Sequence, residues 1–140
     1  MGFTLTSMRK HVKTVDDAVV VVTIITDGLE NASKEYTGAA VKKLVEQLKS
    51  EGWTFTYMGA NQDSTEIAFN LSIRNSRNFD YSAHGTMEGM EKDTSTRMNF
   101  FGRLHAFHSA PKGRGMSSEE RNACYSAMAD EAFDEEEGKV

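Results

Sequence analysis

The feature that most constrains the fold is the apolar run from Ala18 to Ile25, Ala-Val-Val-Val-Val-Thr-Ile-Ile. Nearly all of its residues are β-branched, and they do not alternate with polar ones. This pattern is typical of a strand that is buried on both faces, as in a parallel sheet covered by helices. Because the run is far too short to cross a bilayer, it does not indicate a membrane segment.

The segments around this strand predict alternating helices and strands. Apolar residues at helical spacing, capping residues and a glycine stop at Gly52 define the helices, and aromatic or apolar stretches define further strands. The predicted helices are residues 3–13, 37–51, 63–71 and 85–107, and the predicted strands are residues 18–25, 53–58 and 78–79. Met87, Met90 and Met98 are assigned to the core side of the longest helix. The order predicts an α/β fold, a three-layer Rossmann-like parallel sheet flanked by helices.

The C-terminal part of the sequence is predicted to be organised separately. Residues 1–109 form the α/β domain, residues 110–116 a linker, and residues 117–133 a last helix capped by Ser117 or Ser118. Residues 134–140 are predicted to be a disordered acidic tail, because a run of like charges buries little apolar area. Removing this tail should therefore leave the thermal stability unchanged.

Charge and cysteine content narrow the classes of function. Residues 1–128 hold 15 acidic and 15 basic side chains, so the net charge of −5 comes entirely from residues 129–140. A neutral body argues against nucleic-acid binding, which usually needs a basic stripe. Cys124 is the single cysteine, which excludes an intramolecular disulfide and a Cys-based zinc cluster and favours a reducing, cytoplasmic location. The first twenty residues lack a signal-peptide pattern, so no membrane partner is expected.

Two loops are the expected binding loops, because ligands of an open parallel sheet bind outside the carboxyl ends of its strands. Asp27 directly follows the first strand, and its carboxylate is suited to a divalent cation held by oxygen atoms. The same residue is also suited to cap the turn, with Gly28 supplying an unusual backbone angle, and Asp63 has a structural role as a helix cap. The residues of the two loops that are candidates for binding are Thr26, Asp27, Gly28, Glu30, Asn31, Asn61 and Asp63.

Three stretches resemble bacterial von Willebrand factor A (vWA) domains. They are Val20-Val-Val-Thr-Ile-Ile-Thr-Asp-Gly-Leu-Glu-Asn-Ala-Ser-Lys-Glu-Tyr36, Val41-Lys-Lys-Leu-Val-Glu-Gln-Leu48 and Gly52-Trp-Thr-Phe-Thr-Tyr-Met-Gly-Ala-Asn-Gln-Asp63. The resemblance extends over about residues 2–107 and follows the order of motifs in the C-terminal half of such domains. It implies a partial, vWA-like half-fold that starts inside the helix before the family's fourth strand.

The resemblance also implies an incomplete metal site. The family's metal-ion-dependent adhesion site combines an Asp-x-Ser-x-Ser motif, a Thr and an Asp after the fourth strand, and only this last Asp has a counterpart here, Asp27. One carboxylate holds a hard cation poorly, so at most weak Mg²⁺ binding and no other cofactor is expected. The implied function is a protein-binding or scaffold module, not an enzyme. The alternatives are a metal-dependent hydrolase that uses Asp27 and Asp63, and a truncated gene product without a separate activity.

A homodimer is the expected assembly. In the family's strand order the absent first strand lies beside the fourth, so the run from Ala18 to Ile25 would become a sheet edge. A long β-branched edge without lysine or proline is a template for pairing with another chain. We expect two such strands to pair antiparallel across a twofold axis, which places the two Asp27 loops at opposite ends of the pair.

Overall fold

A computed structural model of the chain describes residues 2–14, 19–26, 38–60, 64–80, 82–109 and 115–138. Within these residues, helices and parallel strands alternate as the sequence predicts. The elements are α1 (Gly2–Val12), β1 (Val21–Thr26), α2 (Gly38–Ser50), β2 (Thr54–Ala60), α3 (Ser64–Asn70), β3 (Asn75–Phe79), α4 (Ala83–Ser109) and α5 (Ser118–Glu137). None of the described helices is long and apolar enough to cross a membrane.

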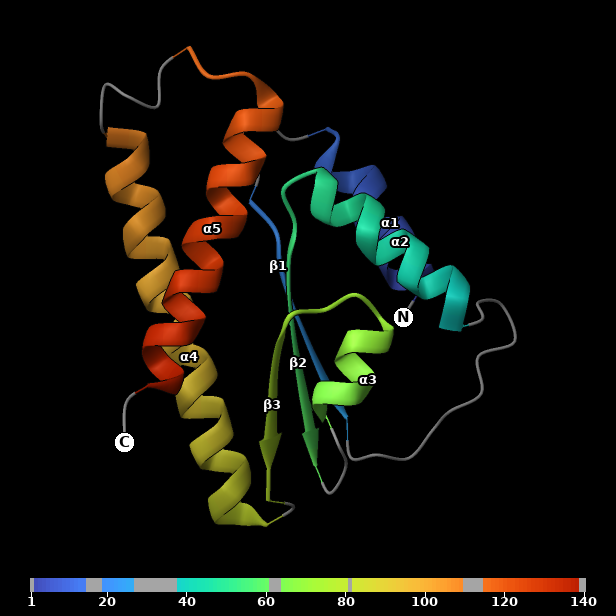
Figure 1. The fold of residues 1–140 in the computed structure, drawn as a ribbon, viewed down its shortest axis with the longest axis vertical. Helices are drawn as coiled ribbons and strands as arrows, with labels where there is room; N and C mark the ends of the chain where they lie inside the picture. Colours follow the sequence, from blue (N-terminus) through green and yellow to red (C-terminus); the bar gives the residue numbers. More distant parts are fainter. Residues whose placement is uncertain are drawn as a thin grey trace.

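The strands form one parallel sheet in the order β1-β2-β3. Val21 lies opposite Thr54 in the register of β1 and β2, and Thr56 lies opposite Asn75 in that of β2 and β3. Helices α1, α2 and α3 cover one face of the sheet, and α4 and α5 cover the other (Figure 1). The α/β fold class with a sheet flanked by helices is therefore confirmed.

The layer between the sheet and helices α1–α3 is apolar. Leu48 of α2 is fully buried there, and Trp53 stacks on Phe55 with 6.4 Å between the ring centroids. The chain turns from α2 into β2 at Gly52, whose φ of 94° lets the Trp53 N–H donate to the Leu48 carbonyl at 3.1 Å. The predicted helix stop at Gly52 is confirmed, and this layer contains the larger of the two clusters of buried apolar residues.

The layer between the sheet and helices α4 and α5 combines an apolar cluster, which includes Phe100 and Leu104, with buried polar groups. Arg77 of β3 donates to the Thr96 hydroxyl of α4 at 2.6 Å, and its guanidinium lies 4.5 Å from the ring centroid of Phe133 in α5. Asn75 donates to the carboxylate of Asp130 at 3.1 Å. Because a buried polar group is costly without a partner, these contacts fix α4 and α5 on the sheet specifically.

The buried face of α4 differs from the predicted one. The side chains of Met87, Met90 and Met98 are exposed and do not belong to the core. The buried residues of α4 are Gly85, Gly89, Asp93, Thr96, Phe100 and Leu104. A Cβ atom on Gly89 would lie 3.2 Å from the methyl group of Met58, so the helix approaches the sheet closely at this point. The first half of this face carries small and polar residues where α4 lies close to the sheet, the second half carries Phe100 and Leu104, and the three methionines lie on the exposed side.

The C-terminal residues also differ from the prediction, because residues 134–137 are helical and not a disordered tail. Ser117 caps α5 as predicted, accepting a hydrogen bond from the Glu120 N–H at 3.2 Å, but the helix continues to Glu137. Three acidic side chains of its last turns accept hydrogen bonds from arginines of the body: Asp134 from Arg74, Glu135 from Arg103, and Glu137 from Arg77. The hydrogen bonds raise the pKa of Arg74 and of Arg103. The acidic run is thus held by opposite charges.

Two strands have other bounds than predicted. β1 starts at Val21, since Val19 and Val20 are described but lie outside the strand, while Ala18 lies outside the described residues. It is half-buried with Ile25 exposed, and not buried on both faces, because β2 is its one neighbour in the described sheet. β3 extends over Asn75–Phe79 and is longer than the predicted pair at 78–79.

Candidate functional site

The predicted binding loops lie mostly outside the described residues. Thr26 is described as the half-buried last residue of β1, opposite Gly59 of β2. The other candidates, Asp27, Gly28, Glu30, Asn31, Asn61 and Asp63, fall outside the described part of the chain. Among the residues that the structure describes, no group of three or more His, Cys, Asp or Glu side chains is placed to hold a metal ion.

The open side of β1 is the first component of a candidate interaction site. The Val20 carbonyl accepts a hydrogen bond from the Thr54 N–H at 3.0 Å, so the backbone groups of Val20 point toward β2. Backbone direction alternates along a strand, and the N–H and C=O groups of Val21, Thr23 and Ile25 therefore point away from β2. No described strand pairs with that side. Such a row of backbone donors and acceptors is a template for another strand.

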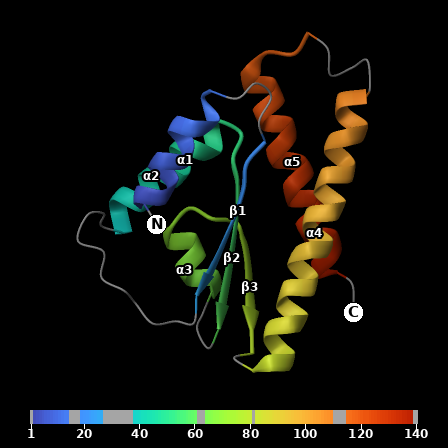
Figure 2. The ribbon, with the colours of Figure 1, turned by 180° about the vertical axis from the view of Figure 1, so that it is seen from behind.

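Exposed apolar side chains lie on the elements around this open side. In Figure 2, α1, β1 and α4 lie toward the viewer. These elements carry six of the seven large exposed hydrophobic side chains among the described residues: Met8, Ile25, Met87, Met90, Met98 and Phe101. The seventh, Phe69, is on α3. We call the open side of β1 together with these six side chains the β1 surface.

A polar network fixes β1 against α4 behind this surface. Arg97 of α4 donates hydrogen bonds to the Thr23 hydroxyl and, at 2.9 Å, to the carboxylate of Asp93. The Thr23 hydroxyl lies 3.4 Å from the same carboxylate, which is mostly buried. Because the network joins the middle of β1 to the middle of α4, it holds the open strand and the exposed side of the helix in a fixed relation.

The sequence predicts the strand of the β1 surface but not the exposed methionines of α4. The β-branched run predicts the edge strand, but the methionines of α4 have the helical spacing that also predicts a core. The signal for the true buried face was the pair Gly85 and Gly89, one turn apart, which marks the side of α4 that approaches another element closely. The contact of Thr23 with Arg97 joins residues 74 positions apart, and no local pattern indicates it.

Comparison with models of known families, with curated proteins and with solved structures finds no match for this chain.

Proposed function

We propose that the chain is a protein-binding module of the vWA type, without enzymatic activity, and that it acts as a homodimer through the β1 surface. The observation that carries this proposal is the open side of β1, where the backbone groups of Val21, Thr23 and Ile25 point outward. Helices α1 and α4, which lie toward the same side of the molecule in Figure 2, carry exposed apolar side chains. Such an edge pairs readily with a further strand. The resemblance to vWA domains supports a binding role.

A second copy fits this edge because the outward groups are arranged symmetrically about Thr23. With Thr23 on a twofold axis, it faces the partner's Thr23, and Val21 faces the partner's Ile25. Each facing pair of this type exchanges two hydrogen bonds in an antiparallel ladder. Ile25, which is 48% exposed, would then be covered across the junction. The same patch serves both copies, as an isologous interface requires.

Light scattering at micromolar concentration tests the proposal. The unmodified chain should have twice the 15.6 kDa mass of one chain. Ile25→Lys should be monomeric, because an edge lysine is a common natural block to strand pairing. Ile25→Pro should act in the same way, since it removes an N–H on the open side and no hydrogen bond to β2.

The matched control is Phe69→Lys, which replaces an exposed apolar side chain of α3, away from β1, by the same lysine. It should leave the dimer intact. A stable monomer for the unmodified chain would refute the homodimer, and a dimer that survives both Ile25 variants would place the interface elsewhere.

A further inference from the structure

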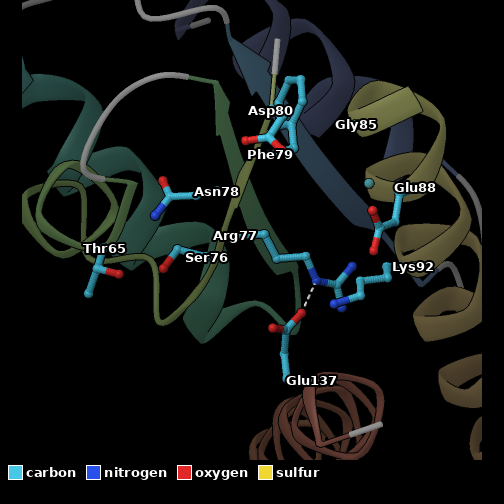
Figure 3. Close-up of a pocket in the computed structure, with 11 residues that line it drawn as sticks. Thr65, Ser76, Arg77, Asn78, Phe79, Asp80, Gly85, Glu88, Lys92 and Glu137 are labelled. Carbon is cyan, nitrogen blue, oxygen red and sulfur yellow. Dashed lines mark hydrogen bonds and ion pairs between the residues drawn. The ribbon is translucent and has the colours of Figure 1, made fainter. Parts of the chain in front are cut away.

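A cavity of about 520 Å³ lies at the carboxyl end of β3, the strand at the opposite edge of the sheet from β1. Side chains of α3, β3, α4 and α5 line it, and most of them are polar (Figure 3). Its volume is in the range of small-molecule sites. The carboxyl ends of strands are also where open parallel sheets bind ligands. This cavity is separate from the β1 surface.

Arg77 forms a fixed cationic wall of the cavity. Its side chain is only 4% exposed, and Nε donates to Glu137 while Nη2 donates to Thr96. The ring of Phe133 packs against the guanidinium. The remaining nitrogen, Nη1, is buried and has no hydrogen-bond partner among the described residues. Because this nitrogen is inaccessible, Arg77 does not contact a ligand through it but places a positive charge behind the cavity wall, which favours an anionic group in the cavity.

Lys92 of α4 brings a second cation to the same cavity. It is half-buried, and within the described part of the chain its ammonium makes no ion pair or hydrogen bond. In Figure 3 its side chain extends toward the region of the Arg77 guanidinium from a different element. Glu137 pairs with Arg77 and compensates its positive charge, so the positive charge of Lys92 is available to a carboxylate of the ligand.

Two acidic residues, Asp80 and Glu88, line the cavity as well. Neither carboxylate forms an ion pair with Arg77 or Lys92, and the Glu88 carboxylate lies 3.9 Å from the ring of His84 on the exposed side of the helix. A ligand that is only anionic would be repelled by these carboxylates. A ligand that is only cationic would be repelled by Lys92. A zwitterion, with one charge of each sign, matches both groups.

We propose that this cavity binds a free amino acid. Its α-carboxylate is held by Lys92, with the positive charge of Arg77 behind it, and its α-ammonium is held by Glu88 and Asp80. The hydroxyl groups of Thr65 and Ser76, which also line the cavity, suit a polar side chain on the ligand.

Titration of the full chain with single amino acids, followed by the NMR signals of the lining amides of Gly85 and Gly89, tests this proposal. At least one amino acid should bind with a dissociation constant below about 1 mM. Its N-acetyl derivative, which lacks the ammonium, and its amide, which lacks the carboxylate, should each bind about 10- to 100-fold more weakly, the effect of one charge-assisted hydrogen bond.

Two variants test which side chains bind the two charged groups of the ligand. Lys92→Gln and Glu88→Gln should each weaken binding about 10- to 100-fold. Both should keep the melting temperature, because Lys92 has no partner in the described residues and Glu88 is exposed. The matched controls are Glu91→Gln, three residues after Glu88 on α4, and Lys42→Gln on α2. Neither residue lines the cavity, so both variants should bind like the unmodified chain.

The proposal is overturned if no amino acid binds at 10 mM, roughly ten times the expected dissociation constant. It is equally overturned if the N-acetyl derivative binds as tightly as the free amino acid, which would identify a simple anion site. Unchanged affinity in folded Lys92→Gln would show that the ligand binds elsewhere.

Discussion

Removal of residues 134–140 is expected to destabilise the fold, although this segment is an acidic run at the end of the chain. The truncation removes the carboxylate of Glu137 and leaves Arg77, only 4% exposed, without its anionic partner. It also removes Asp134, which pairs with Arg74 at 2.8 Å, and it exposes the end of α5 beside the buried ring of Phe133.

The expected loss of unfolding free energy follows from how far each broken ion pair is buried. Breaking a fully buried ion pair costs about 3–5 kcal/mol, but Glu137 is 37% exposed, so about 1.5–3 kcal/mol is expected for this contact. The exposed pair of Arg74 and Asp134 adds at most about 1 kcal/mol. A total of about 2–4 kcal/mol is a large part of the stability of a typical domain. At roughly 2–4 °C per kcal/mol, the melting temperature should fall by about 5–15 °C.

Thermal and urea unfolding, followed by circular dichroism at one fixed protein concentration, measure this loss. The control truncation ends at Gly138 and removes only Lys139 and Val140, so it should melt like the full chain. Glu137→Gln should reproduce much of the effect of the long truncation, because it keeps the helix but removes the charge opposite Arg77. If the long truncation melts within about 2 °C of the full chain, the end of α5 does not stabilise the fold, and the burial argument for Arg77 is refuted.

Three further predictions follow from the packing of α4 and from the first binding loop. Gly85→Ala should destabilise by about 1–3 kcal/mol, because its Cβ would lie 2.5 Å from the backbone carbonyl oxygen of Asp80, whereas Gly102→Ala, with open space around it, should stabilise the helix by up to about 1 kcal/mol in denaturant unfolding. Phe100→Ala should cost about 3–5 kcal/mol and Phe101→Ala far less, since the two side chains are 2% and 48% exposed; equal losses in the same assay would show that α4 is rotated. Calorimetric titration with Mg²⁺ should detect weak or no binding, and a micromolar site that is lost in Asp27→Ala would contradict the incomplete metal site.

The fold class could be predicted from the sequence because its signals are local. The β-branched run before Thr26, the stripe of α2 and the glycine stop at Gly52 each depend on neighbouring residues, and together they specify parallel strands separated by helices. β3 was underestimated because Asn75-Ser-Arg-Asn-Phe79 contains few residues that favour strands. Its position is set by pairing with β2 and by the contacts of Asn75 and Arg77.

The face of α4 and the state of the C-terminus could not be predicted locally. Hydrophobicity assigns the methionines to the core, but Asp93 and Thr96 of α4 face the polar side chains of Thr23 and Arg77 on the sheet, and the methionines lie on the exposed side. The acidic run of α5 is neutralised by Arg74, Arg77 and Arg103, which lie 32 to 60 positions earlier in the sequence. The cavity beside β3 has the same origin, since its charged residues converge from three separate elements.

Amide hydrogen exchange in β1, measured by NMR as a function of protein concentration, tests the proposed dimer most directly. The N–H groups of Val22 and Ile24 point toward β2 and should exchange slowly at every concentration. Those of Val21, Thr23 and Ile25 point to the open side, so they should exchange slowly in the dimer and become fast on dilution to the monomer. Fast exchange of these three amides at concentrations where the chain is dimeric would contradict pairing through β1.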